Sequence, residues 1–349
     1  IGVAFGDTIT FRYDDPGGLP HRPAQSLEVT GSIFDGSDGR LWAFTKQFDD
    51  PEMAVRVQFR LAESLFEMAK DYRRLNQRDR SAQAIDEGKR ILEEVLVNNP
   101  ETALAVEGEY LLAHLYAELG AESERDNPDA AREFFQEALS RFSLLLSNHP
   151  DSDFAPRAQF QRALALERLG DFSAASEEYV KLTYIFPDSP LVGDASIRLA
   201  THFFRNEQRF DIAGRIFSNF ATRFPSHPMA GRAMFMSAQS HMRQAETWED
   251  ELRAQGLPES QVKTPRVIDE YLRAVASFQV LIDDQTGAID RDIRAQAMYW
   301  AGDASLRALD YPGAYLFLRR TVFEYPESEW ARRARGLLLQ SARLFEGLD

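Results

Sequence analysis

The sequence predicts an all-α fold, a solenoid of stacked helix pairs, with a short β-rich arm at its N-terminal end. One proline-centred junction recurs along the chain, amphipathic helical patterns flank each junction, and small residues recur at matching places in those helices. Two short helices cannot bury their apolar faces alone, so such pairs need copies stacked beside them. Residues 1–50 instead show the alternation of strands.

The junctions mark the ends of the repeats. In each, a ring or amide side chain precedes a proline, and an acidic or hydroxyl residue follows it closely. Proline cannot donate a backbone hydrogen bond and disfavours helix at the preceding residue, whereas Asp, Ser and Thr cap the next helix. Pro150, Pro187 and Pro225 lie 37 and 38 residues apart, which is enough for two helices and a turn. The five junctions are Asn99–Thr102, His149–Ser152, Phe186–Ser189, Phe224–His227 and Tyr325–Ser328.

The clearest unit spans Ala295–Ser328, with one helix before the break at Asp310–Gly313 and a second helix after it. This pattern resembles the tetratricopeptide repeat (TPR) family, whose helix–turn–helix repeats of about 34 residues end near a proline. The family places small residues where its two helices cross. The matching pairs here are Ala62 with Gly88, Ala113 with Ala138, Ala163 with Ala175, Ala200 with Ala213, Ala238 with Ala274, and Gly302 with Ala314.

The resemblance implies six helix pairs and a C-terminal capping helix over residues 51–349, in a right-handed superhelix. The junctions look most like those of bacterial cell-envelope members, the Tol–Pal-associated periplasmic repeat protein and the outer-membrane-assembly repeat lipoproteins. Gln159 and Arg162 depart from the pattern, because apolar residues are usual at their positions.

Residues 1–50 are predicted to be a β-rich arm or the end of a preceding β domain. Three runs have strand character, Ile9–Tyr13, Leu27–Phe34 and Arg40–Phe44, and the last two are candidates for a hairpin. The loop Asp35–Gly39 reads as a turn rather than a calcium site, because it holds only two carboxylates.

An insertion at Ala245–Pro265 interrupts the fifth repeat. We expect it to project from the edge of the solenoid, with Trp248 either contacting a partner or packing on its own helix. Because contacts in a solenoid join nearest neighbours, its deletion is expected to leave stability nearly unchanged.

The composition argues against several classes of protein and of site. The net charge of −15 disfavours general nucleic-acid binding, which needs a basic face. The absence of cysteine excludes disulfides and Cys-based metal sites. No apolar run reaches 18 residues, so no membrane span is predicted. The chain begins at Ile1 without a visible signal peptide, which leaves open a removed leader or a longer protein.

No catalytic, cofactor or metal site is predicted. Motifs for zinc proteases, nucleotide binding and serine hydrolases are absent, and the six histidines are scattered. Carboxylate pairs such as Glu177–Glu178 and Asp283–Asp284 are expected to face solvent. The chain is therefore predicted to be a non-enzyme without cofactors.

The resemblance implies a binding surface on the concave face, which the first helix of each pair lines. Arginine forks grip carboxylates, and aromatic or methionine side chains hold apolar anchors, so an extended acidic segment is one expected ligand. In the alternative reading, the rings are core and the arginines a solvated rim. The predicted partner-binding residues are Arg157, Phe160, Arg168, Arg198, Arg205, Arg232, Phe235, Met236, Arg243, Tyr299, Trp300 and Arg307.

Nearer the N-terminal end the same face is expected to be acidic, with Glu63, Glu67 and Glu118. Two function classes follow. The first is a protein-interaction scaffold of the bacterial cell envelope, placed in the periplasm with a cytoplasmic location as the alternative. The second is a structural subunit of a large assembly, contacting neighbours through the arm, the insertion and the solenoid edges.

Overall fold

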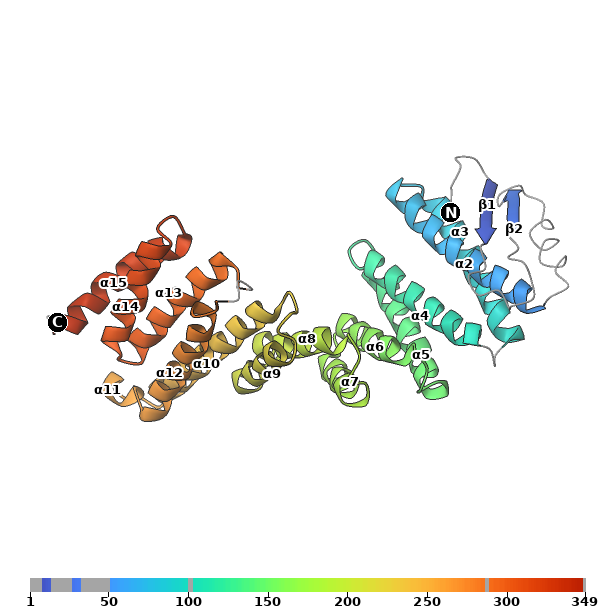
Figure 1. Cartoon of the computed structure of the whole chain (residues 1–349). Coiled ribbons are helices and arrows are strands. Elements are labelled where there is room, and N and C mark those ends of the chain that lie inside the picture. Colours follow the sequence, from blue (N-terminus) through green and yellow to red (C-terminus); the bar gives the residue numbers. More distant parts are fainter. Residues whose placement is uncertain (1–7, 14–26, 33–50, 100–102, 286–288, 348–349) are drawn as a thin grey trace. The chain divides into compact units, whose positions relative to one another are not determined.

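The computed structural model describes residues 8–13, 27–32, 51–99, 103–285 and 289–347 (Figure 1). The contacts divide the chain into two compact units, Ile1–Phe154 (unit 1) and Ala155–Asp349 (unit 2). The predicted boundary between an arm over 1–50 and a solenoid over 51–349 stays a prediction.

The described residues of unit 1 form two helix pairs and one pair of strands (Figure 1). Strand β1 (Thr8–Tyr13) pairs antiparallel with β2 (Leu27–Ser32). The predicted hairpin with the run at 40–44 lies outside the described residues, so the β-rich arm as a whole stays a prediction. The paired helices are α2 (Pro51–Arg74) with α3 (Arg78–Asn98) and α4 (Ala103–Ser123) with α5 (Pro128–Asn148).

Unit 2 continues the same pattern with four helix pairs and a further helix, α15 (Glu329–Glu346), which packs on α14. The short α11 (Glu259–Val262) lies within the predicted insertion. The pairs are α6 (Ala155–Leu169) with α7 (Phe172–Ile185), α8 (Val192–Arg205) with α9 (Phe210–Arg223), α10 (Ala230–Ala254) with α12 (Pro265–Ile282), and α13 (Arg291–Arg307) with α14 (Tyr311–Glu324).

The described residues thus form an all-α, TPR-like arrangement of fourteen helices packed in pairs, apart from β1 and β2. The predicted order of six pairs and one closing helix is confirmed, and α11 is the one helix that the prediction lacked. The handedness of the superhelix stays a prediction. Below, the first helix of a pair is called helix A and the second helix B.

Local chemistry explains where the helices begin and end. Side chains of Asn127, Asp171, Asp310 and Ser328 each accept a hydrogen bond from an amide in the first turn of the helix that follows. The ring or amide residue of each predicted junction is the C-cap, whose backbone amide donates to the carbonyl four residues earlier. These C-caps are Asn99, His149, Phe186, Phe224 and Tyr325.

The predicted helix crossings are close. Ala113, Ala138, Ala200 and Ala213 have no exposed surface, and Ala238 shares one hydrophobic cluster with Ala274. At Gly302 in α13, an added Cβ would lie 2.6 Å from Cγ of Leu318 in α14. Only a small residue fits at such a point, because side-chain atoms in a packed interior rarely approach below van der Waals contact.

The two departures from the family pattern meet a common partner. Gln159 and Arg162 on α6 both reach the carboxylate of Glu178 on α7, the arginine at 3.4 Å. Lys181 contacts the same carboxylate at 2.7 Å. The prediction that Glu178 faces solvent is therefore wrong, since the residue is 3% exposed. A buried polar network replaces apolar packing in this helix pair, and its charges compensate one another.

Candidate interaction surface

The first helices of the pairs in unit 2, α6, α8, α10 and α13, carry all twelve predicted partner-binding residues. We call their exposed and half-buried side chains the helix-A surface of unit 2. The structure sorts the predicted residues into three groups: buried rings, half-buried residues and exposed arginines.

Two of the predicted rings belong to the core. Phe235 has no exposed surface and packs against the ring of Phe278, with centroids 5.4 Å apart. Phe160 is 9% exposed and packs against Tyr179. For these two rings the alternative reading, in which the aromatics are interhelix core, describes the structure.

Six arginines of the helix-A surface are exposed, namely Arg157, Arg168, Arg198, Arg205, Arg232 and Arg243. Several of them link neighbouring first helices. Arg198 on α8 contacts Glu167 on α6 at 3.0 Å, and Arg232 on α10 donates to the side-chain oxygen of Gln296 on α13 at 3.5 Å. Within the described residues, Arg157 and Arg205 form no ion pair.

Arginines also cover the rings beneath them. The guanidinium of Arg232 lies 5.2 Å from the ring centroid of Phe235, and that of Arg243 lies 5.6 Å from the ring centroid of Phe210. A guanidinium stacked on a ring keeps its in-plane N–H groups available to carboxylates. Phe235, which was predicted to lie in the binding surface, therefore supports Arg232 from below.

The half-buried residues gather on α10 and α13. The rings of Tyr299 and Trp300 meet with centroids 5.3 Å apart, and Tyr299 also contacts Trp330 of α15 at 5.6 Å. Burial raises the pKa of Tyr299, so its hydroxyl stays neutral at physiological pH. Met236 packs half-buried against the cluster of α8 and α9. These three side chains can offer part of their apolar surface to a ligand.

Arg307 is the most constrained of the predicted arginines. It contacts Asp303 at 2.8 Å and Glu246 at 3.2 Å. Burial by itself would lower the pKa of Arg307, but the charge of Asp303 and its other partners outweigh burial, so the pKa is raised. The side chain is committed to joining α13 to α10.

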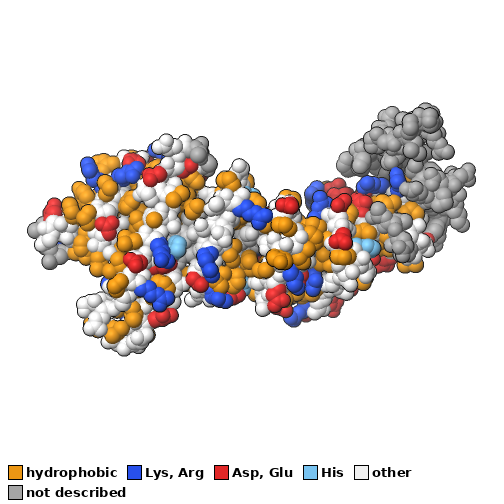
Figure 2. Space-filling model, turned by 60° about the horizontal axis from the view of Figure 1, so that its bottom comes forward, with side chains coloured by type: hydrophobic (Ala, Val, Ile, Leu, Met, Phe, Trp, Pro, Cys, Tyr) orange, Lys and Arg blue, Asp and Glu red, His pale blue; other side chains and the backbone are white. Residues whose placement is uncertain are grey.

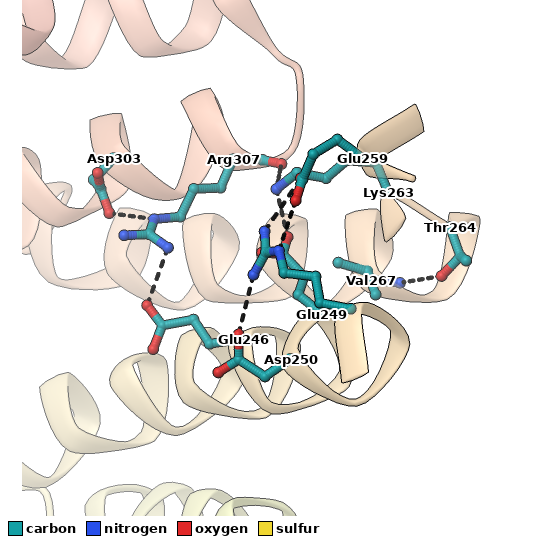
Figure 3. A network of polar contacts seen from close by, with 10 residues as sticks. Glu246, Glu249, Asp250, Glu259, Lys263, Thr264, Val267, Asp303 and Arg307 are labelled. Carbon is teal, nitrogen blue, oxygen red and sulfur yellow. Dashed lines mark hydrogen bonds and ion pairs between the residues drawn. The ribbon is translucent and has the colours of Figure 1, made fainter. Parts of the chain in front are cut away.

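The two ends of the insertion pack against the helix pairs (Figure 3), whereas most side chains between Asp250 and Gln261 are exposed, so the predicted projection from the edge is wrong for the ends of the segment. Glu249 and Val262 are 3% and 0% exposed, and Trp248 packs partly buried against the core with Arg266 lying 3.6 Å from its ring centroid. Of the two predicted roles for Trp248, the structure shows packing. We therefore expect deletion of the insertion to lower the stability of the fold, contrary to the prediction from the sequence.

A charge network fixes the insertion. The Glu249 carboxylate receives Lys263 and Arg253, the latter at 3.1 Å. Lys263 also donates to the backbone carbonyl of Arg307 at 2.9 Å (Figure 3). Arg253 contacts Glu259 at 2.8 Å. Sequence reasoning missed this network because long charged side chains in an insertion are usually solvated.

In unit 1, the predicted acidic residues are largely paired. Lys70 contacts Glu67 at 3.0 Å and Glu118 at 3.2 Å, and Glu63 contacts Arg60 at 2.5 Å. The acidity is nevertheless uneven along the chain: unit 1 holds 29 acidic and 16 basic residues, whereas unit 2 holds 26 acidic and 24 basic residues. Nearly all of the net charge therefore resides in unit 1.

Charges of both signs and hydrophobic side chains are interspersed over the coloured part of the face in Figure 2. Within the part of the chain that the structure describes, no group of three or more His, Asp or Glu side chains could hold a metal ion. None of the described helices combines the length and the apolar character that crossing a bilayer requires.

The sequence matches no protein-family model and no curated protein. Among solved structures, the chain is similar to a tetratricopeptide repeat protein from Parabacteroides merdae, at 15% identity and a TM-score of 0.34, covering 81% of this chain and 99% of that chain. It is also similar to BtubC from P. vanneervenii, at 16% identity and a TM-score of 0.38, covering 80% of this chain and 91% of that chain.

A third similar structure is PilW, a type IV pilus biogenesis factor, at 15% identity and a TM-score of 0.34, covering 78% of this chain and 97% of that chain. The assignment of the fold rests on the helix pairs of the chain itself.

Proposed function

We propose that the protein is a non-catalytic interaction scaffold, which docks an extended acidic segment of a partner protein across the helix-A surface of unit 2. The observation that carries this proposal is the row of exposed arginines on three successive first helices, α6, α8 and α10. Arginine presents several N–H groups in a fixed plane and binds carboxylates with two bonds at once. Such a row suits a ligand that carries acidic residues at intervals.

The surroundings of these arginines support this choice of ligand. Unit 2 is close to neutral overall, so its exposed arginines are not embedded in an excess of acidic residues. Tyr299, Trp300 and Met236 are half-buried and supply apolar surface beside the row. In interfaces of this kind, partly buried aromatic and methionine side chains contribute most of the affinity, and charges set the orientation and the association rate.

The test uses the complete chain and a fluorescein-labelled peptide of alternating Glu and Phe separated by Gly and Ser. Arg198→Glu combined with Arg232→Glu should weaken peptide binding by at least tenfold. The matched control is Arg215→Glu combined with Arg319→Glu, two exposed positions on the second helices α9 and α14. Unfolding free energies of both double variants should stay within about 0.5 kcal/mol of each other, as is usual for surface changes. Equal binding by the two double variants would exclude the helix-A surface as the binding site.

A second candidate function is a structural subunit of a larger assembly. Tyr184 on α7 and Phe323 on α14 favour it, because they are 86% and 71% exposed. Large exposed apolar side chains on the second helices are suited to permanent contacts with neighbouring subunits. If Tyr184→Ser and Phe323→Ser abolish recovery of the native complex while Arg198→Glu and Arg232→Glu do not, this second function is supported.

For the compartment, we propose the bacterial periplasm, with the cytoplasm as the alternative. The support is the resemblance of the proline junctions to those of cell-envelope repeat proteins. Fractionation of the native cells, followed by detection of the protein with an antibody against unit 2, distinguishes the two compartments. Recovery of the protein with cytoplasmic markers alone would reject the periplasmic location.

A further inference from the structure

Helix α15 has the position of a first helix, yet the described residues include no second helix packed against its outer face. The residue thirteen positions after each junction proline shows this. It is Ala113 in α4, Ala163 in α6, Ala200 in α8 and Ala238 in α10, and each is 0% exposed at the crossing with its helix B. After Pro326 the same position is Leu339, which is 59% exposed. Among the residues that the structure describes, none covers the face of α15 that would meet a helix B, and we call it the open face of α15.

This open face is basic. Arg332 and Arg335 lie about two turns and one turn before Leu339, and Arg343 lies one turn after it, so all four share one side of the helix. The three arginines are exposed, and within the described residues they form no ion pair. Arg333, on another side of α15, differs in this respect because it contacts Glu329 at 2.5 Å.

Two helix pairs of the same unit show what the fold places opposite a polar residue at this interface. Gln159, nine positions after its junction proline as Arg335 is after Pro326, hydrogen-bonds the carboxylate of Glu178 on helix B. His241 on α10 contacts the carboxylate of Glu270 on its helix B at 2.7 Å. In both pairs, a glutamate of the second helix meets the polar side chain of the first.

We propose that the open face of α15 binds an acidic amphipathic α-helix of a partner protein, docked as a helix B in trans. Glutamates of that helix would face Arg332, Arg335 and Arg343, and a small residue would cross at Leu339. The site is separate from the helix-A surface of unit 2 and does not depend on it. Recognition of a helix through its apolar and charged face is a common mode of peptide binding.

Charge argues against the other occupants of this face. Two copies of α15 packed face to face would bring three arginines against three arginines, which is unfavourable without counterions. An anionic membrane would require a broad apolar face, as amphipathic membrane helices have. On α15 the large exposed apolar side chains are only Leu339 and Phe345, and Phe345 stacks on Tyr315 with centroids 6.2 Å apart.

The test titrates the complete chain with a fluorescein-labelled, end-blocked helical peptide of Ala, Leu and Glu. Its glutamates lie on one face, around a central alanine. The matched probe carries Gln in place of every Glu. We expect saturable binding of the Glu peptide that weakens as salt rises, and at least tenfold weaker binding of the Gln peptide.

Three protein variants locate the site. The triple variant Arg332→Glu, Arg335→Glu and Arg343→Glu should lose at least tenfold in affinity. Since Arg and Glu both favour helix, α15 should remain folded, which circular dichroism checks. The control triple, Arg80→Glu, Arg132→Glu and Arg215→Glu, makes the same charge change at exposed positions on other helices and should bind within threefold of wild type. Arg198→Glu with Arg232→Glu, which tests the proposed function, should also leave this binding unchanged.

Three results would overturn the proposal. The first is equal binding of the Glu peptide by the α15 triple and the control triple. The second is no binding of wild type at peptide concentrations up to about 1 mM. The third is that wild type binds vesicles of anionic phospholipid but not the Glu peptide, and that the α15 triple abolishes this vesicle binding. Loss of binding in the α15 triple alone supports it. A further variant, Leu339→Glu, should reduce binding through the same face and tests the apolar contact at the crossing.

Discussion

Replacing Gly302 by alanine tests the helix crossing of α13 and α14 against an internal control. Alanine is favoured over glycine in a helix interior by about 1 kcal/mol. At Gly302, however, the new Cβ would lie 2.6 Å from Cγ and 2.8 Å from Cδ2 of Leu318, both well inside ordinary contact distance. Overpacking of this kind costs about 1–3 kcal/mol. We therefore expect Gly302→Ala to lower the free energy of unfolding by about 1 kcal/mol in total.

Gly336 in α15 provides the matched control, because a Cβ there meets nothing within 4 Å. Gly336→Ala keeps the helix-propensity gain and should raise the free energy of unfolding by up to about 1 kcal/mol. The two variants make the same chemical change and should differ in sign. Urea unfolding followed by circular dichroism and tryptophan fluorescence measures both. If Gly302→Ala is as stable as Gly336→Ala, the close crossing is absent and the paired-helix packing described here is incorrect at that point.

Three further predictions concern buried polar side chains. Glu178→Ala leaves Gln159 and Arg162 without their partner and should lower the free energy of unfolding by about 2–4 kcal/mol. Replacing all three residues by leucine should be neutral or stabilising, and equal unfolding midpoints for the two variants would contradict this. Lys263→Met should cost about 2–3 kcal/mol by leaving the buried Glu249 carboxylate with Arg253 alone, and adding Glu249→Gln should recover part of the loss in a melting experiment. Burial raises the pKa of Tyr271 above its ordinary value of 10, so above pH 10 the hydroxyl ionises in the unfolded chain before it ionises in the folded one. The free energy of unfolding of wild type should therefore fall by up to about 1.4 kcal/mol per pH unit because of this side chain. Tyr271→Phe should lack this contribution, so its unfolding free energy should fall less steeply above pH 10 than that of wild type. Equal slopes of unfolding free energy against pH for the two proteins would show that the hydroxyl is not buried.

The repeat architecture was predictable because its signals are local. At the described junctions, the residue before the proline ends one helix, because proline cannot continue it. The predicted side-chain cap on the next helix is present at Ser328, whereas Leu191 and Met229, the N-caps of α8 and α10, provide none. A small residue at a helix crossing is required by the side chain directly opposite it. The positions of Ala113, Ala200 and Gly302 could therefore be assigned from the sequence, and the structure buries all three.

The candidate site was less predictable, because burial of a polar group depends on which partner the fold brings near. Glu178 looked solvent-exposed from its own helix, but Gln159 and Arg162 lie on the neighbouring helix and compensate it. Phe235 lies on the predicted helix face, yet it is turned into the pair and covered by Arg232. Helical spacing indicates which side of a helix a residue occupies, but it does not show how deeply the neighbouring helices bury its side chain.

The Glu249 network also determines which helices can separate from one another. Lys263 holds the carboxylate of Glu249 on α10 and the carbonyl of Arg307 at the end of α13, so detaching either helix would strand a buried charge. In an ordinary repeat array, each helix pair opens nearly independently of the next but one. Here α10, α12 and α13 are joined into a single cooperative unit, and their amide protons should exchange with solvent through a common opening, while those of α15 exchange by local fraying.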